Sequence, residues 1–453
     1  MNIVIVGCGR IGSTLVQELS GENHDISIID EKAEIVQELA ETCDVLGVIG
    51  NGASYSILSE AGVEDADIVI AVTNSDELNL LCCLIAKKAG KCQTLARVRN
   101  PVYYDEIKFI QEEMGISRVL NPELGAAYEI ARLLRFPSAM EVNKFSKGRM
   151  ELLKYRIPAG SRLDGLNLSE ISVHLNCDVL VCAVERKKEL IIPTGTFELR
   201  ERDVISFVAR PNDAMEFFRK IGEKENQVHD VMIVGGSKIA FYLCKQLASS
   251  GIHAKLIDKR LERCEELSDQ LPKTMVIHGN GMDHNLLLEE GLLDTDAFLA
   301  LTNHDEENIF LSLYVQEQTD AKLVTKVQKI NYDAMISRLE LGSMIYPEYI
   351  TAQYLVQYVR AKQNSIGSNI KNLYKLMDGR AEALEFHIQK GSPVIGIPIQ
   401  NLPIIKNLLI CSIYRDGRAK IPNGQDVILE NDLVVVVTTK KGLHDVKDIL
   451  RKG

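Results

Sequence analysis

The sequence contains an internal repeat that spans about half of its length. An offset of 228 residues aligns Ile5–Gly12 with Ile233–Ala240, and the same offset aligns Asp30 with Asp258. At an offset of 229, the matched segments are Gly50–Gly52 with Gly279–Gly281 and Thr73–Asn79 with Thr302–Asn308. Because these landmarks keep their order, the chain is a tandem duplication of one module. The period is too long for a solenoid, whose units have roughly 20 to 50 residues.

Composition places the chain among ordinary soluble globular proteins. Of its 453 residues, 46% are hydrophobic and 25% are charged, which excludes a disordered chain. This length corresponds to roughly two to four domains of typical size. The formal net charge of −11 argues against a nonspecific nucleic-acid binder, because such proteins carry a basic surface.

The sequence predicts a cytoplasmic protein without a membrane span. Its most apolar window, Leu78–Ala86, is far shorter than the roughly 18 residues that a spanning helix needs. The start, Met1–Gly7, is typical of a strand and lacks the regions of a secretory leader. Neither the ten cysteines nor the nine histidines show a metal-binding spacing, so we expect reduced cysteines and no metal site.

The first part of each half alternates short apolar runs with amphipathic segments, which is typical of βαβ units. In the first half, strands are expected at 2–6, 25–29, 45–49, 67–72, 93–98 and 116–120, and helices at 11–19, 34–41, 55–60 and 78–89. In the second half, strands are expected at 231–234, 253–257, 273–277, 295–301 and 322–327. This pattern predicts an α/β fold with two tandem Rossmann-like domains, each a doubly wound parallel sheet.

The second part of each half changes to strand-turn-strand patterns, for example at 179–184 and 433–437. Such patterns predict a small α+β domain of about 80 residues after each Rossmann-like domain. The four domains predicted in this way are 1–140, 141–225, 228–365 and 366–453.

A glycine-rich loop lies between the first predicted strand and the first predicted helix. It has the form Gly-x-Gly-x-x-Gly at Gly7, Gly9 and Gly12. Gly7 permits a tight turn, Gly9 lets backbone amides approach a pyrophosphate, and Gly12 lets the helix pack on the strand. Asp30 ends the next strand and can accept hydrogen bonds from a ribose diol, which favours NAD or an adenosine nucleotide over NADP. Alternatively, the glycines serve only chain reversal and Asp30 caps a helix.

The corresponding loop of the second half departs from this fingerprint. Ser237 replaces the second glycine and Ala240 replaces the third, whereas Gly235, Gly236 and Asp258 are retained. Alanine is accepted at the third position, but a Cβ at Ser237 crowds the approach of a pyrophosphate. The second half therefore either binds a nucleotide or is retained for the geometry of assembly alone.

Two Thr-Asn pairs, Thr73-Asn74 and Thr302-Asn303, follow the fourth predicted strands. Ligands bind at this edge of such sheets, so the pairs are candidate contacts to adenosine or ribose. The alternative is a helix cap, since Ser75 and Asp76 precede the next helix.

Cationic side chains near these positions are candidates for binding a polyphosphate. Arg10 lies in the first glycine loop, and Arg97 and Arg99 lie at the end of the fifth strand. The second half has Lys238 and Lys326 instead. The alternative is that they are solvated surface charges.

The sequence does not favour an enzyme. A dehydrogenase needs a proton donor, such as a histidine paired with a carboxylate, in a substrate domain. The small domains have only His174 in the first copy, and His387 and His444 at unmatched positions in the second. A ligand sensor is the better class, and an NAD-dependent oxidoreductase and an interaction-only scaffold are the competing hypotheses.

The motifs, in their order and with their duplication, resemble one protein family. The residues that carry the resemblance are Val4–Gly12, Asp30, Gly50–Ala53, Ala71–Asn79, Ala96–Arg99, Asp203 and Asp432. Together they are similar to the bacterial and archaeal regulators of potassium conductance (RCK) in a form with two modules per chain, and the resemblance covers essentially the whole sequence.

The resemblance implies a regulatory subunit without catalysis. Its Rossmann-like lobes would bind NAD, NADH, ATP or ADP, without a metal, and a homotetrameric ring would dock on the cytoplasmic face of the cell membrane. The implied partner is a separate membrane-embedded potassium-translocating subunit of the TrkH or TrkG type, gated by a conformational change. The ligand contacts carried over by position are Gly7, Cys8, Gly9, Arg10, Ile11, Asp30, Thr73, Asn74 and Arg97, with Gly235, Gly236, Ser237, Lys238, Ile239 and Asp258 as a second site.

Overall fold

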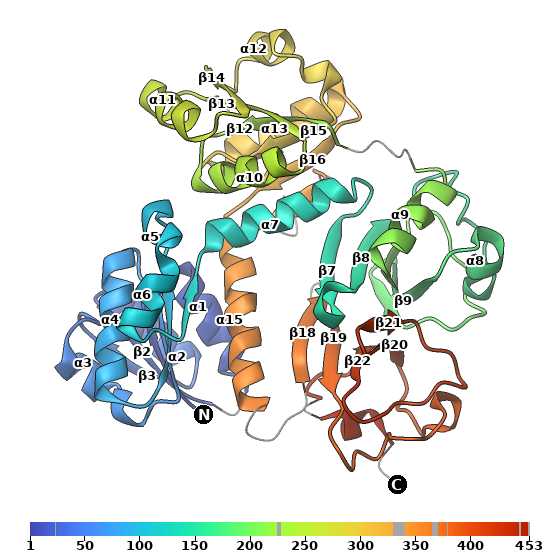
Figure 1. The fold of residues 1–453 in the computed structure, drawn as a ribbon, viewed down its shortest axis with the longest axis horizontal. Helices are drawn as coiled ribbons and strands as arrows, with labels where there is room; N and C mark the ends of the chain where they lie inside the picture. Colours follow the sequence, from blue (N-terminus) through green and yellow to red (C-terminus); the bar gives the residue numbers. More distant parts are fainter. Residues whose placement is uncertain are drawn as a thin grey trace. The chain divides into compact units, whose positions relative to one another are not determined.

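The computed structural model describes residues 1–22, 24–223, 228–328, 339, 341–364, 370–377, 379–443 and 445–451. These residues form four sheets in two compact units (Figure 1). The first unit comprises 1–130, 230–319 and 323–359, and the second comprises 131–229, 320–322 and 360–453. The predicted domain limits at 225, 365 and 366 and the predicted His444 lie outside the described residues.

The first sheet is parallel and has the strand order β3-β2-β1-β4-β5-β6. Its strands are β1 Asn2–Val6, β2 Asp25–Asp30, β3 Leu46–Ile49, β4 Ile68–Ala71, β5 Gln93–Arg97 and β6 Arg118–Leu120. Its helices are α1 Arg10–Leu19, α2 Ala33–Thr42, α3 Tyr55–Glu60, α4 Asp76–Ala89, α5 Pro101–Asp105 and α6 Ile107–Met114. The order reverses between β1 and β4, and this switch point brings the carboxyl ends of both strands beside the first glycine loop.

The second sheet repeats this arrangement in the order β14-β13-β12-β15-β16-β17. Its strands are β12 Asp230–Val234, β13 His253–Asp258, β14 Thr274–His278, β15 Ala297–Ala300, β16 Lys322–Lys326 and β17 Ser343–Ile345. Its helices include α10 Lys238–Ser249, α11 Leu261–Gln270, α12 His284–Glu289 and α13 Asp305–Gln318. The two predicted doubly wound sheets are therefore confirmed, and we call them the first and second lobes.

A long helix of the second half, α15 Pro347–Asn364, packs in the core of the first lobe. The α15 side chains that enter this core are Ala352, Leu355, Val356 and Val359. On the same helix, the Tyr358 hydroxyl donates to Gln93 Oε1 of β5 at 2.8 Å. The matching helix of the first half, α7 Pro122–Arg135, begins beside α10, where Asn121 Nδ2 donates to the Tyr242 hydroxyl at 2.9 Å. The sequence analysis did not predict either crossover helix.

The second compact unit contains two antiparallel sheets with matching strand orders, β10-β9-β11-β8-β7 and β18-β19-β22-β20-β21. The strands of the first are β7 Glu141–Phe145, β8 Met150–Arg156, β9 Val179–Arg186, β10 Glu189–Ile191 and β11 Val204–Ala209, with helices α8 Leu168–Leu175 and α9 Pro211–Lys220. The strands of the second are β18 Ile370–Leu376, β19 Ala381–His387, β20 Leu408–Arg415, β21 Arg418–Lys420 and β22 Leu433–Thr438. Both sheets contribute to one apolar core, in which Cys182 and Cys411 are fully buried.

The repeated aspartates of these small domains have a structural role. Asp203 accepts two hydrogen bonds from the Arg186 guanidinium at 2.8 and 2.7 Å, and Asp432 accepts the same pair from Arg415 at 2.7 Å each. Both aspartates are buried in the turn before the last strand. A bidentate pair in this place fixes the turn in both copies.

Two further findings concern the whole chain. Among the described residues, no helix is both long and apolar enough to cross a membrane. All ten cysteines are free thiols, and nine of them are buried.

The pH dependence of stability tests the burial of Lys322 at the start of β16. The ammonium group donates to the Ala139 carbonyl at 2.6 Å, and burial lowers the pKa of Lys322 to about 7. A pKa that is lower in the folded state means that folding disfavours the charged form of the side chain. This free-energy cost is fully present below the folded pKa and disappears above the unfolded pKa of about 10.4. We expect Lys322→Met to raise the free energy of unfolding near pH 7 and to lose this advantage as the pH approaches 10.

Chemical denaturation between pH 6 and 10 measures this difference, with Lys91→Met, at an exposed position, as the control. A difference that does not change with pH would mean that Lys322 keeps its charge at neutral pH in the folded protein.

Candidate functional site

The first glycine loop is shaped by two glycines that the fold requires. Gly7 has a φ of +95°, and a Cβ there would lie 2.7 Å from the backbone nitrogen of Thr73. A Cβ on Gly12 would lie 2.0 Å from the Gly7 carbonyl oxygen. By contrast, a Cβ on Gly9 would meet no heavy atom within 4 Å. The space in front of Gly9 is therefore open, as the approach of a pyrophosphate requires.

The amino end of α1 begins at this open position. Gly9 is the N-cap of the helix, and no side chain caps the amides of its first turn. Uncapped amides and the helix dipole favour an anion at such a position. Asp30 fixes the loop, because its two carboxylate oxygens accept from the amides of Cys8 at 2.7 Å and of Lys32 at 2.9 Å. Each oxygen keeps a further lone pair for another donor.

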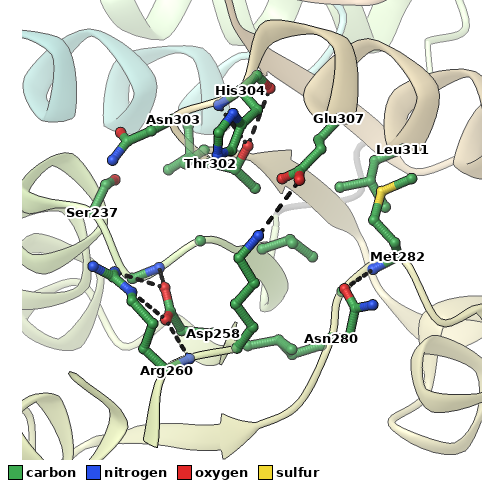
Figure 2. A pocket seen from close by; sticks show the side chains of 17 residues that line it. Ser237, Asp258, Arg260, Asn280, Met282, Thr302, Asn303, His304, Glu307 and Leu311 are labelled. Carbon is green, nitrogen blue, oxygen red and sulfur yellow. Dashed lines mark hydrogen bonds and ion pairs between the residues drawn. The ribbon is translucent and has the colours of Figure 1, made fainter. Parts of the chain in front are cut away.

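The second loop has the same backbone but a different cap. Gly235 has a φ of +107°, and a Cβ there would lie 2.7 Å from the Thr302 nitrogen. Ser237 is the N-cap of α10, and its hydroxyl accepts from the Ala240 amide at 3.3 Å. The serine thus occupies an amide that is uncapped in the first lobe. A cavity of about 170 Å³ lies beside this loop (Figure 2).

The acidic residue of the second lobe is paired with an arginine. Asp258 accepts from the Gly236 amide at 2.6 Å and from the Arg260 guanidinium at 2.9 and 3.1 Å (Figure 2). Burial alone would raise the pKa of Asp258, but the hydrogen bonds from Arg260 and Gly236 outweigh it and the pKa is lowered. Asp258 is therefore ionised and neutralised by Arg260.

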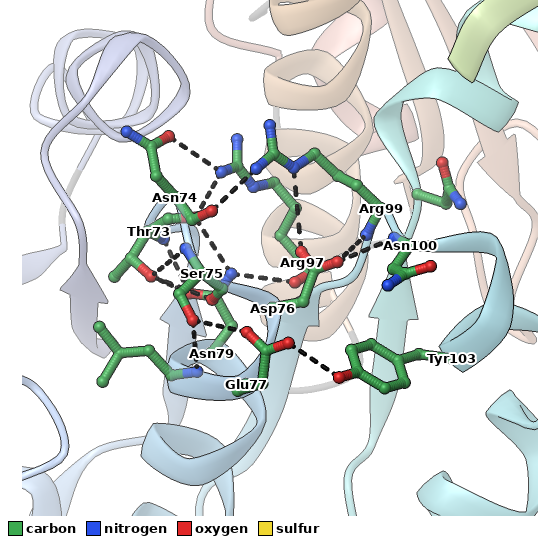
Figure 3. A network of polar contacts seen from close by, with 12 residues as sticks. Thr73, Asn74, Ser75, Asp76, Glu77, Asn79, Arg97, Arg99, Asn100 and Tyr103 are labelled. Atoms are coloured by element: carbon green, nitrogen blue, oxygen red, sulfur yellow. Dashed lines mark hydrogen bonds and ion pairs between the residues drawn. The ribbon is translucent and has the colours of Figure 1, made fainter. Parts of the chain in front are cut away.

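A buried asparagine joins the ends of two strands in each lobe. Asn79 Oδ1 accepts from the Thr73 amide at 2.8 Å, and Asn79 Nδ2 donates to the Arg97 carbonyl at 2.9 Å (Figure 3). Asn308 makes the same two bonds to Thr302 and Lys326, at 2.9 Å each. The sequence analysis did not assign a role to either asparagine, although both align in the repeat.

The predicted cation Arg97 is buried against the Thr-Asn pair. Its guanidinium donates to the Thr73 carbonyl and, at 3.2 Å, to Asn74 Oδ1. Lys326 takes the same place in the second lobe, where Nζ donates to the Thr302 carbonyl at 3.0 Å. Burial lowers the pKa of both Arg97 and Lys326, with neighbouring Arg99 adding to the effect on Arg97. The alternative of solvated surface charges is therefore wrong for both positions.

The alternative role of a helix cap belongs to Ser75, the residue that follows the Thr73-Asn74 pair. Ser75 Oγ accepts from the Leu78 amide at 3.1 Å and caps α4 (Figure 3). Asp76 accepts from the amides of Arg99 at 2.9 Å and Asn100 at 2.8 Å. Thr73 and Asn74 instead hold the cations that end β5.

The two glycine loops line one cleft of about 880 Å³ within the first compact unit. The Arg10 side chain lines this cleft. Its Nη1 donates to Glu348 at 3.0 Å and to Gln328 at 2.9 Å, both of which belong to the second half. The cations that line the cleft are Arg10, Arg97, Arg99, Lys238, Arg260, Arg263 and Lys326, and the carboxylates are Glu123, Glu266 and Glu348. This excess of positive charge suits a polyphosphate.

The structure distributes the predicted site residues between these two hollows. Those that line the cleft are Gly9, Arg10, Ile11, Asn74, Arg97, Gly236, Ser237, Lys238 and Ile239. Those that line the smaller cavity are Gly235, Gly236, Ser237 and Asp258. Gly7, Cys8, Asp30 and Thr73 line neither and hold the first loop in shape.

Several cleft residues were not predicted as site residues. Glu123 and Glu348 each follow a proline at the start of a crossover helix, and Arg260 and Arg263 lie in and after the loop that follows β13. The repeated Pro-Glu pair is the one signal that could have indicated the two glutamates. Burial raises the pKa of Glu123.

Comparison with known protein families decides the relationship. Residues 3–122 and 231–347 match the TrkA-N domain, and residues 152–222 and 383–451 match the TrkA-C domain. The chain belongs to the TrkA family. Over all of its length, it is 32% identical to the Trk system potassium uptake protein TrkA of Halomonas elongata, across 460 residues and 99% of that protein. It is 30% identical to a TrkA homolog of Archaeoglobus fulgidus over 100% of both chains. The predicted RCK resemblance is thus confirmed.

Solved structures share the fold of this TrkA-family chain at lower identity. The GsuK channel bound to NAD has a TM-score of 0.61 and 17% identity, over 97% of this chain and 77% of that chain. The GsuK RCK domain gives the same TM-score of 0.61 and covers 97% of this chain and 92% of that chain, at 17% identity. GsuK bound to ADP reaches a TM-score of 0.50 at 15% identity, over 80% of this chain and 69% of that chain. These likenesses confirm the fold class.

Metal ligands are not gathered in the part of the chain that the structure describes. No group of three or more His, Cys, Asp or Glu side chains there is placed to hold a metal ion. The chemistry of the hollows is instead that of backbone amides, guanidinium and ammonium groups, which bind anions.

The asparagine that joins β4 and β5 should be essential to the first lobe. Asn79→Ala leaves the Thr73 amide and the Arg97 carbonyl without their partner, and each unpaired buried group costs about 1–3 kcal/mol. We expect the free energy of unfolding to fall by about 2–4 kcal/mol. Asn79→Asp should cost more, because it places a charge against the Arg97 carbonyl.

Urea denaturation measures these losses, with Asn100→Ala, a partly exposed position between β5 and α5, as the control. If Asn79→Ala and Asn100→Ala lose the same amount, the strand ends do not depend on the asparagine.

Proposed function

We propose that this chain is the nucleotide-sensing regulatory subunit of a Trk-type potassium uptake system. The membership of the TrkA family supports the assignment to potassium uptake. The observation that carries nucleotide binding is the first glycine loop, where two glycines are required by the fold and Gly9 leaves an open, uncapped helix end. Four domains, 1–140, 141–225, 228–365 and 366–453, form part of this proposal.

The ligands would be NAD or NADH, with ATP or ADP as alternatives. Their phosphates would lie at the amino end of α1, where Arg10 and the cleft cations offset the charge. Asp30 would accept the ribose hydroxyls with its remaining lone pairs, while the Thr73-Asn74 turn faces the same edge of the sheet. That related GsuK structures contain NAD and ADP supports this choice.

The effect of the ligand would be mechanical rather than catalytic. A nucleotide that binds one arrangement of the lobes better than another shifts the population between them, and a difference of about 1–3 kcal/mol is sufficient. In a homotetrameric ring on the cytoplasmic face of the membrane, this shift would act on the TrkH- or TrkG-type potassium-translocating subunit. The names of the relatives and the fold shared with channel RCK domains support this role.

A charge placed at the N-cap tests the first site without breaking the helix. We expect Gly9→Asp to abolish binding of NAD, NADH, ATP and ADP at the first lobe, because the carboxylate occupies the anion position. Aspartate is a favoured N-cap residue and a Cβ at Gly9 meets no atom, so the fold should remain intact. Calorimetric titration and thermal shift measure the change, and Asp30→Asn, which keeps one acceptor oxygen, should weaken binding less.

Ser237→Asp is the matched variant in the second lobe, and it should weaken binding at the first site far less than Gly9→Asp, because Ser237 caps α10 and not α1. Nucleotide binding that survives both aspartate variants together would refute the assignment of these loops.

Gating needs the membrane partner. In vesicles that contain the potassium-translocating subunit, rubidium flux should respond to NAD, NADH, ATP or ADP when the wild-type chain is added, and not when Gly9→Asp is added. The nicotinamide absorbance should stay constant throughout, since the alternative of an NAD-dependent oxidoreductase would change it. A rubidium flux that does not change with any of these nucleotides would contradict the proposed sensor function. The chain would then have a structural role in the uptake system.

A further inference from the structure

The loop after the second strand of each lobe differs in charge between the two lobes. In the first lobe it reads Asp30-Glu31-Lys32, and in the second lobe it reads Asp258-Lys259-Arg260. These three residues carry a formal charge of −1 in the first lobe and +1 in the second. This loop lies where the ribose of a nucleotide meets a Rossmann-like sheet.

The helix that follows this loop adds to the difference. Arg263 of α11 replaces Ile35 of α2 at the repeat offset of 228. Arg263 Nε donates to the Gly236 carbonyl at 2.8 Å, so the guanidinium is held against the second glycine loop. Its other face pairs with Glu266 at 2.6 Å.

In the first lobe, each oxygen of the corresponding carboxylate keeps a lone pair for a further donor. Within the part of the chain that the structure describes, Asp30 accepts from two backbone amides, one on each oxygen. Glu31 accepts from Asn51 Nδ2 at 3.0 Å and places a second carboxylate on the same loop. A ribose diol can donate to Asp30, whereas a phosphate on the 2′ oxygen would meet two carboxylates.

In the second lobe, the equivalent carboxylate is saturated. Asp258 Oδ1 accepts from the amide and from Nε of Arg260, both at 2.9 Å. Asp258 Oδ2 accepts from the Gly236 amide at 2.6 Å and from Nη2 of Arg260 at 3.1 Å. Each oxygen thus has two donors, which fills its lone pairs. A ribose diol can donate to Asp258 only if Arg260 is displaced.

The cations at this position have donors to spare. Arg260 uses Nε and Nη2 for Asp258, and its side chain is 57% exposed, so the remaining guanidinium donors are accessible at a residue that lines both hollows. Lys259 lines the same cavity and is balanced by Glu307 at 3.5 Å. Guanidinium groups bind phosphate oxygens in a bidentate manner, and an arginine near this acid is what accommodates a 2′-phosphate in Rossmann folds.

We propose that the second lobe binds a dinucleotide or adenine nucleotide that carries a phosphate on the ribose 2′ oxygen, such as NADP or NADPH, whereas the first lobe binds the unphosphorylated ribose. Lys259 and Arg260 are the residues that determine this specificity. The inference rests on the proposed nucleotide binding and adds a second class of ligand to it. One chain would then bind two different nucleotides, one in each lobe.

The experiment isolates each lobe in the full-length chain. In the Gly9→Asp variant, the second lobe alone is titrated by calorimetry with NADP and NAD, and with the smaller pair adenosine 2′,5′-bisphosphate and AMP. We expect the 2′-phosphorylated member of each pair to bind about tenfold or more tightly, and this preference to shrink as salt increases. In the Ser237→Asp variant, the first lobe should prefer NAD and AMP.

A loop exchange supplies the control for specificity. Lys259→Glu with Arg260→Lys, introduced in the Gly9→Asp chain, gives the second lobe the first loop's sequence and should remove the preference. Equal binding of both members of each pair, or tighter binding of NAD, in the Gly9→Asp chain would overturn the inference while leaving the proposed function intact. If neither lobe binds any of the four ligands and both variants melt as the wild type does, the proposed function itself fails.

Discussion

The arrangement of the first compact unit depends on the burial of one face of α15. This helix belongs to the second half of the sequence, but it packs in the core of the first lobe. Ala352, Leu355, Val356 and Val359 are fully buried there. Burial of a leucine or valine side chain contributes about 1.5–3 kcal/mol each, so withdrawal of the helix would cost several times the energy of one surface contact. The two lobes therefore stay together, and their glycine loops remain on one cleft.

The two lobes share residues with a structural role and differ at positions that the proposed ligand would contact. The positive-φ glycine and the strand-end asparagine are the same in both lobes, and each has a steric or hydrogen-bonding reason that does not involve a ligand. The lobes differ at the N-cap, where Ser237 replaces Gly9, at Ala240, which replaces Gly12, and in the loop that carries Lys259 and Arg260. Changes in the first set would therefore lower stability, whereas changes in the second set would alter the proposed ligand recognition.

Much of this could be predicted because it is local in sequence. The predicted strands of both lobes and the predicted helices of the first lobe match the observed ones within about two residues, since hydrophobic period and the glycine loop are properties of short segments. The crossover helices could not be predicted, because the core that buries α15 lies in the other half of the chain. The burial of Arg97 and the contact of Arg10 with Glu348, 338 residues away, likewise depend on tertiary structure. The four hydrogen bonds to Asp258 in the second lobe depend on the conformation of the Arg260 side chain, which the spacing of residues in the sequence does not predict.

The charges of the cleft explain how a bound anion can act on the lobes. Arg97 and Lys326 are buried cations, and burial without a full counter-charge lowers the pKa of both side chains. The polyphosphate of the proposed nucleotide would supply that counter-charge. The Arg10–Glu348 ion pair is 52% and 31% exposed, and such pairs contribute no more than about 1 kcal/mol, so a phosphate can take Arg10 from the carboxylate. Glu348 lies in the first turn of α15, the helix whose other face anchors the first lobe. Exchange of one partner of Arg10 therefore changes the contacts at the start of the element that connects the two lobes.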